Sequence, residues 1–359
     1  MLGGLNIRKE LSSLLAMRES NRDWLMAPLS AVCMGVPLLL GLYLGSIQAG
    51  LLAGLGGLVI VYLPETGTIT NRIVTLLICS FGFMVSFTIG QIASINHLSS
   101  VLTIGVFTGI VHWIVLFYKS AQPKSFFFVL IIALSICQPF NLADIPTKVG
   151  LIGLGTMFSS VFGLAYIMRL RVKQKELVSL PIDPVLRKND FANYWEAIIL
   201  GAFMAIALGV GYLMGLDSPY WIPVSSAAVM QGASRYHIWQ RTVQRIVGTF
   251  VGLGLCWLLL HASSSIWVIG VFIVVLQLIV ELTVVKNYAL AVVFITPLAI
   301  FLADAANPVI NTPDALISLR FIEICVGSLI GAIGGWVLHR EQIRYATLKG
   351  LAKLGELGK

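Results

Sequence analysis

The sequence predicts an all-α polytopic membrane protein, with about twelve transmembrane helices arranged as two parallel six-helix repeats. Hydrophobic residues make up 58% of the chain and charged residues 11%, whereas a soluble domain carries roughly a quarter charged residues. Apolar stretches long enough to cross a bilayer follow one another along the chain. Short patterns also recur in the same order in its two halves. A soluble globular protein is therefore excluded.

Windows of about 20 apolar residues define the predicted spans. They lie at 27–44, 47–64, 73–95, 98–118, 125–140, 147–168, 194–215, 220–233, 242–261, 265–285, 287–304 and 315–338. The resulting organisation is a cytoplasmic amphipathic segment at 1–26, a first repeat at 27–168, a cytoplasmic linker at 169–193, a second repeat at 194–338 and a basic cytoplasmic tail at 339–359.

Lysine and arginine are distributed unevenly over the segments that connect these spans. If successive segments alternate between two sides of a membrane, almost all of the 24 cations fall on the side that holds both termini. Lys148 falls on the other side, and Arg320 lies inside a span. This bias predicts cytoplasmic termini. It also explains the net charge of +8 without nucleic acid as a partner.

Several patterns match between the halves. GLYLG at 41–45 and GYLMG at 211–215 each end a first span, and NRIV at 71–74 and QRIV at 244–247 each open a third span. Because each unit contains an even number of spans, both units enter the membrane from the same side. The repeats are therefore expected to be parallel, related about the membrane normal.

A cationic stretch connects the eighth and ninth predicted spans and contains Arg235, Arg241 and Arg245. One interpretation is a cytoplasmic loop that follows the positive-inside bias. The other is an anion-attracting vestibule at the inner mouth of a transport path. Arg245 is the best candidate for the second, because it opens the next span close to Thr249 and a glycine pattern that permits close helix packing.

Few charges are predicted at membrane depth, where they are costly and mark candidate functional sites. Arg320 and Glu323 are three residues apart, so they share one helix face and can neutralise each other. They form either a structural ion pair, or a site in which Glu323 carries a proton or Arg320 meets an anionic substrate. Glu281 ends the tenth span near Lys286, either as an interfacial ion pair or as a proton-coupling carboxylate.

Short or proline-interrupted spans at matching places in two repeats indicate a substrate site. The prolines concerned are Pro139, Pro223 and Pro297. Tyr220, Trp221 and Gln231 lie next to one of these interruptions and are candidates to line the path. Tyr220 and Trp221 also fit an aromatic belt at the membrane surface.

The sequence contains no recognisable catalytic or cofactor motif. The cysteines and histidines are dispersed, and neither a metal-binding cluster nor a nucleotide-binding loop is present. We therefore expect no enzyme activity, no cofactor and no metal site.

The pattern Tyr-Trp-x-Pro before Gln231, then R-x-x-x-R-x-x-G-T-x-x-G from Arg241 to Gly252, resembles the fusaric acid resistance protein-like family, which includes the aromatic acid exporters. The R-x-x-E stretch that begins at Arg320 and is followed by a glycine is also similar. The resemblance covers 194–338 and is degenerate over 27–168. Larger exporters carry a substantial cytoplasmic domain between their halves, so this chain resembles the compact, all-membrane members.

The resemblance implies proton-motive-force-driven export of aromatic or other weak organic acids across a bacterial inner membrane, with a periplasmic adaptor (membrane fusion) protein as a further partner. Alternatives are a passive organic-anion channel and a non-transporting membrane scaffold of the cell envelope. The sequence leaves self-association open. The expected substrate-binding residues are Arg245, Arg241, Arg320, Tyr220, Trp221, Gln231 and Thr249, and the expected proton-coupling residues are Glu323 and Glu281.

Overall fold

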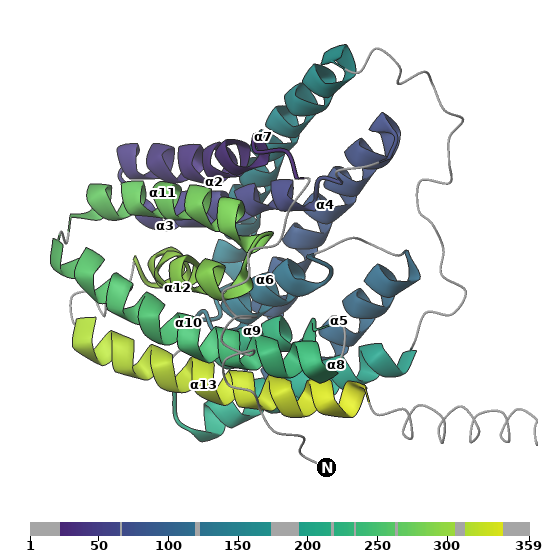
Figure 1. Ribbon diagram of the computed structural model, residues 1–359, viewed down its shortest axis with the longest axis vertical. Helices are drawn as coiled ribbons and strands as arrows, with labels where there is room; N and C mark the ends of the chain where they lie inside the picture. The colour runs from purple at the N-terminus through teal and green to yellow at the C-terminus, as the bar shows by residue number, and fades with distance from the viewer. Residues whose placement is uncertain are drawn as a thin grey trace, which may run out of the picture.

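The structure is a computed structural model that describes residues 22–64, 67–118, 123–173, 194–216, 219–232, 235–262, 265–305 and 313–339. The amphipathic segment expected at 1–26 and the tail at 339–359 fall almost entirely outside these ranges. Regular secondary structure in the described residues is helical (Figure 1). The α-helices are α2 (Met26–Tyr43), α3 (Ile47–Gly57), α4 (Ile69–Ala93), α5 (His97–Phe117), α6 (Phe126–Ile136), α7 (Ile145–Lys173), α8 (Tyr194–Leu213), α9 (Trp221–Met230), α10 (Arg235–Ala262), α11 (Ile266–Val284), α12 (Tyr288–Asp304) and α13 (Pro313–Leu338), with 3-10 helices η1 (Leu58–Tyr62) and η2 (Leu142–Asp144).

Each predicted span corresponds to one of these α-helices, in the same order. Eight helices in the described part of the chain are long and apolar enough to cross a membrane. The protein is therefore a multi-pass membrane protein. Four apolar helices are shorter: α3 together with η1, α6, α9 and α12.

Helix α7 continues through Lys173 and so extends into the segment predicted to be the linker. Two predicted boundaries were wrong. Helix α10 already begins at Arg235, which places Arg241 in a helix instead of a loop. Hydropathy windows end where polar residues begin, but arginine and lysine are good helix formers. Conversely, α6 ends at Ile136, so Pro139 follows the helix instead of interrupting it.

Helix α9 lies in the interior of the molecule, and all of its residues are buried. It contacts α13, α8, α6 and α10, and Figure 1 shows α6, α9 and α12 in the middle of the bundle with longer helices around them. Gly327 and Gly331 let α13 approach the backbone of α9 closely. A Cβ at Gly327 would lie 2.4 Å from the Ile222 carbonyl oxygen, and a Cβ at Gly331 would lie 2.7 Å from the Ser226 carbonyl oxygen. These glycines therefore let α13 pack directly against the backbone of α9.

Helix α12 contains Pro297, which has no N–H to donate to the carbonyl of Val293. That carbonyl faces Gly252 of α10, where an added Cβ would lie only 2.7 Å from the oxygen. The carbonyl four residues before Pro37 of α2 faces Gly57 of α3 in the same way. In both places a glycine lets a neighbouring backbone approach a carbonyl that the proline leaves without its helical partner.

Helix contacts recur in matching pairs along the chain. Helix α3 packs on α7 as α9 packs on α13, α4 packs on α6 as α10 packs on α12, and α4 packs on α7 as α10 packs on α13. The first six helices, α2–α7, and the last six, α8–α13, form two six-helix sets. Between these sets, α5 contacts α8 and α11 contacts α2, while α6 contacts α9 and α12 contacts α3. The second and fifth helices of each set are the short ones.

Candidate functional site: an arginine series along helix α9

Arg245 lies ten residues into α10, within a membrane-spanning segment, and is 5% exposed. Its guanidinium donates to two hydroxyl groups: Nη2 to Ser225 Oγ of α9 at 3.1 Å and Nη1 to Tyr288 Oη of α12 at 3.3 Å. The ion pairs between described residues do not include it, and its buried Nε has no hydrogen-bond partner there. Arg245 is therefore a buried cation held by neutral groups, and one of its donors is unused.

Arg241 lies one turn before Arg245 and contacts the other end of the same helix. Its Nη1 donates to the carbonyl oxygen of Ala228 at 3.2 Å, and its guanidinium lies 5.0 Å from the centroid of the Tyr288 ring. A cation at the last turn of a helix satisfies carbonyls that have no helical partner and is favoured by the helix dipole. Arg241 therefore caps the C-terminal end of α9.

Arg320 contacts the N-terminal end of α9. It forms a buried ion pair with Glu323, as the spacing predicted, and its Nη2 donates to Tyr220 Oη at 3.2 Å. Its guanidinium also lies 5.3 Å from the Tyr220 ring and 5.6 Å from the Trp221 ring. Tyr220 and Trp221 are both buried. They therefore face the interior and do not form a belt at the membrane surface.

The three guanidinium groups contact α9 at Tyr220, Ser225 and Ala228. At a rise of 1.5 Å per residue, these contacts are spread over about 12 Å of helix axis. The structure thus places the predicted arginines one after another along a buried helix instead of gathering them at one point. Only Arg320 among them is paired with a carboxylate in the described residues.

Two further predicted residues lie near this series. Thr249 is one turn beyond Arg245 on α10; its hydroxyl is buried and has no hydrogen-bond partner among the described residues. Gln231 follows the last residue of α9, and its Nε2 donates to the carbonyl oxygen of Pro123 at 3.4 Å. Tyr288, which contacts both Arg245 and Arg241, was missed because a tyrosine at the start of a span has the pattern of an interfacial aromatic.

Glu281 is buried at the end of α11 and forms an ion pair, but the expected partner was wrong. Its carboxylate lies 2.9 Å from Arg22 Nη1, whereas Lys286 is exposed. The reason is tertiary: α11 packs on α2, and this brings the segment before α2 to the end of α11. Asp23 of that segment accepts a hydrogen bond from Tyr166 Oη at 2.8 Å.

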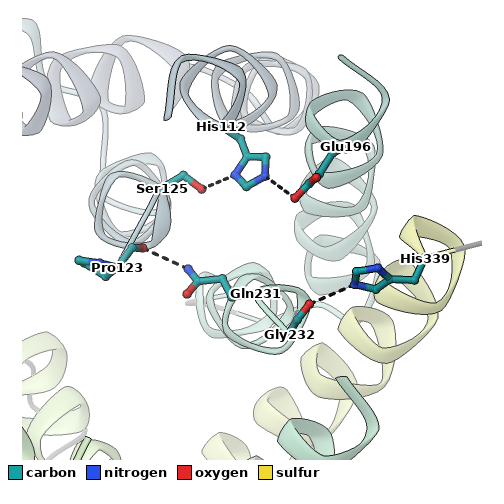
Figure 2. A network of polar contacts seen from close by, with 7 residues as sticks. All are labelled: His112, Pro123, Ser125, Glu196, Gln231, Gly232 and His339. Carbon is teal, nitrogen blue, oxygen red and sulfur yellow. Dashed lines mark hydrogen bonds and ion pairs between the residues drawn. The ribbon is translucent and has the colours of Figure 1, made fainter. Parts of the chain in front are cut away.

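A polar network that the sequence did not predict connects α5 and α8 (Figure 2). His112 of α5 is buried; its Nδ1 lies 2.8 Å from Ser125 Oγ and its Nε2 lies 3.4 Å from Glu196 Oε1 of α8. In the sequence, His112 is one of several dispersed histidines. The two residues are 84 positions apart, so no local pattern links them.

Among the described residues, no group of three or more histidine, cysteine or acidic side chains is arranged to hold a metal ion. The cysteines are free thiols at separate places: Cys33, Cys79, Cys137, Cys256 and Cys325.

The helices that carry the arginine series also carry the family signature. Residues 204–334 match the fusaric acid resistance protein-like family. The resemblance predicted from the sequence is thus confirmed for this part of the chain, which contains α9, α10 and most of α13. The fusaric acid resistance protein-like segment therefore includes Arg241, Arg245, Arg320 and Glu323.

One curated relative is the "Uncharacterized membrane protein YvaC" of Bacillus subtilis (strain 168). It is 34% identical to this chain over 144 residues, which are 40% of this chain and 22% of the relative. The match thus spans only about a fifth of that protein's length. No solved structure matches this chain.

Proposed function

We propose that this protein is a membrane transporter that exports organic anions, aromatic or other weak carboxylic acids among them. The observation that carries the proposal is Arg245: a permanently charged side chain, buried in a membrane-spanning helix, whose partners are two hydroxyl groups. Burying a charge is costly unless it is paired. A carboxylate substrate would supply the missing counter-charge, and guanidinium binds a carboxylate bidentately.

The arrangement along α9 supports a route for that anion. Arg241, Arg245 and Arg320 contact this one buried helix in turn, so an anion could pass from one cation to the next. Tyr220, Trp221, Gln231 and Thr249 would line this route. The family match supports transport in general, while the aromatic-acid substrate comes from the resemblance.

We further propose that α2–α7 and α8–α13 are parallel repeats, over residues 27–168 and 194–338. The matching contacts of their helices support this, as do the short second and fifth helices of each set. The Lys/Arg bias supports a bacterial inner-membrane location with both termini in the cytoplasm. The proton motive force is the proposed energy source, and a periplasmic adaptor protein and a second copy of this chain are proposed partners. We do not propose an enzyme activity.

The test is flux of labelled 4-hydroxybenzoate into proteoliposomes that contain the purified protein, with and without an imposed pH gradient. We expect accumulation against a concentration gradient only when the pH differs. Arg245→Gln should reduce the initial rate by roughly tenfold or more, because loss of a desolvated charge-assisted contact costs about 1.5–3 kcal/mol. Lys286→Gln is the matched control: it removes an exposed cation and should leave the rate unchanged.

The other outcomes separate the alternatives. Downhill flux that is indifferent to pH would identify a passive anion channel. Absence of flux for several organic anions would favour a membrane scaffold. Full activity of Arg245→Gln would reject the assignment of the substrate site while leaving transport itself intact.

A further inference from the structure

The His112–Glu196 pair lies where the two six-helix sets meet. α5 and α8 contact each other directly, and the imidazole of His112 is enclosed between Ser125 and Glu196 (Figure 2). Both ring nitrogens therefore have a polar partner.

Glu196 is partly exposed, whereas two other carboxylates, Glu323 and Glu281, are buried beside arginines. Glu323 faces Arg320, and Glu281 faces Arg22. An arginine remains charged at all physiological pH values. Glu196 contacts a histidine, the side chain whose charge changes between about pH 5 and 8.

We propose that His112, together with Glu196, is the proton-binding site of the transporter. The proposal rests on the proposed function, because it names the residues through which the pH gradient acts. With Glu196 ionised and His112 neutral, Nε2–H donates to the carboxylate, and Nδ1 accepts from the Ser125 hydroxyl. A proton that binds Nδ1 reverses this second bond: Nδ1–H then donates to Ser125 Oγ, and the Ser125 hydroxyl hydrogen turns to another acceptor.

The reversal takes place beside the end of α9. Ser125 lies two residues after Pro123, whose carbonyl oxygen accepts from Gln231 at the end of α9. The next residue, Gly232, has its carbonyl oxygen 3.1 Å from Nε2 of His339. A rearrangement at Ser125 therefore acts on the turn that holds one side of α9, the helix that carries the contacts of Arg245.

Other charged groups lie on the elements that pack against α5, namely α8, α6 and α4. Among the described residues they are Glu196 on α8, Lys124 before α6 and Arg72 at the start of α4. Of these, Glu196 contacts His112. Tyr194 of α8 stacks on Trp113, next to the histidine, with ring centroids 5.6 Å apart. The proton site therefore consists of His112, Ser125 and Glu196, in an aromatic setting.

The experiment compares His112→Gln with wild type in proteoliposomes loaded with 4-hydroxybenzoate. Exchange at equal pH on both sides should stay within about twofold of wild type, because glutamine keeps a hydrogen-bonding side chain at the position. Accumulation driven by one pH unit, about tenfold for one proton per substrate, should disappear. Glu196→Gln should behave similarly, and the exposed His261→Gln should behave as wild type.

Accumulation by His112→Gln at the wild-type level would overturn the proposal. Failure of the wild type to move any tested anion would count against the proposed function instead. In that case 15N NMR of histidine-labelled protein in detergent micelles tests the proton site without a transport assay. A resonance that titrates between about pH 5 and 8, is absent in His112→Gln and is shifted in Glu196→Gln supports the proton site. A His112 resonance that does not titrate in that range rejects it.

Discussion

At the scale of single residues, the two arginines Arg320 and Arg245 differ in role because their partners differ. Arg320 is neutralised by Glu323 and enclosed by two aromatic rings, so it stabilises the packing of α13 on α9. Arg245 donates to Ser225 and Tyr288, which carry no charge. Arg245 thus has no counter-ion among the described residues, whereas Arg320 has one within the protein.

We predict that Glu323→Gln destabilises the protein by about 3–5 kcal/mol, because it leaves the buried Arg320 charge without its counter-ion. Arg320→Gln should have a comparable effect. The double variant Arg320→Gln/Glu323→Gln should lose less than the sum of the two. Thermal unfolding in detergent measures all three, and wild-type stability of both single variants would contradict an energetically important pair.

The variant Glu323→Gln also separates the two roles predicted for this residue. If Glu323 carried the coupling proton, the folded variant would exchange 4-hydroxybenzoate at equal pH but would not accumulate it under a pH gradient. The structure leads us to expect loss of stability without that selective loss of coupling.

At the scale of elements, helix α9 is stabilised by the helices that enclose it. Its ten residues are too short to cross a membrane and are all buried, so it persists because other helices enclose it. Pro223 occupies its first turn, where a missing N–H costs no helical hydrogen bond. Arg241 satisfies a carbonyl in its last turn, and glycines of α13 allow the close approach along its length.

We predict that Gly331→Ala destabilises the packing of α13 on α9 by about 1–3 kcal/mol, the usual cost of overpacking. The new Cβ would lie 2.7 Å from a backbone carbonyl oxygen, which cannot move without displacing α9. Gly254→Ala in α10 is the matched control, since a Cβ there meets nothing within 4 Å. Equal melting temperatures for the two variants would show that this contact is not tight.

At the scale of the whole molecule, contacts between the two six-helix sets hold the halves together and position the site. Helices α5 and α8 meet through Gly105 and Gly201, whose backbones approach closely. The ion pair of Arg22 with Glu281 adds a contact beside the packing of α2 on α11. The arginine series lies in the second set, and the His112–Glu196 pair bridges both.

We predict that Ala143 and Lys286 lie on opposite sides of the membrane. Both are exposed and connect helices, Ala143 before α7 and Lys286 before α12. In spheroplasts, a membrane-impermeant maleimide should label Ala143→Cys directly and Lys286→Cys only after permeabilisation. The unsubstituted chain gives the background from its own cysteines. Labelling of both from outside would reject the proposed topology.

The sequence by itself determined that the protein is a membrane protein, how its helices succeed one another, and which arginines lie among them. These properties depend on composition and on neighbours along the chain, because hydropathy windows and helix-face spacing are local quantities. The Arg320–Glu323 pair was predictable for the same reason: its partners are three residues apart.

Only the tertiary structure decided which residues face one another across helices. Glu281 meets Arg22 instead of the nearby Lys286, Tyr288 joins Arg245 and Arg241, and His112 meets Glu196. Each of these contacts joins residues that are distant in sequence, and helix packing fixes them. Hydrophobicity reports whether a segment is compatible with lipid, but it carries no information on which buried side chain finds which partner.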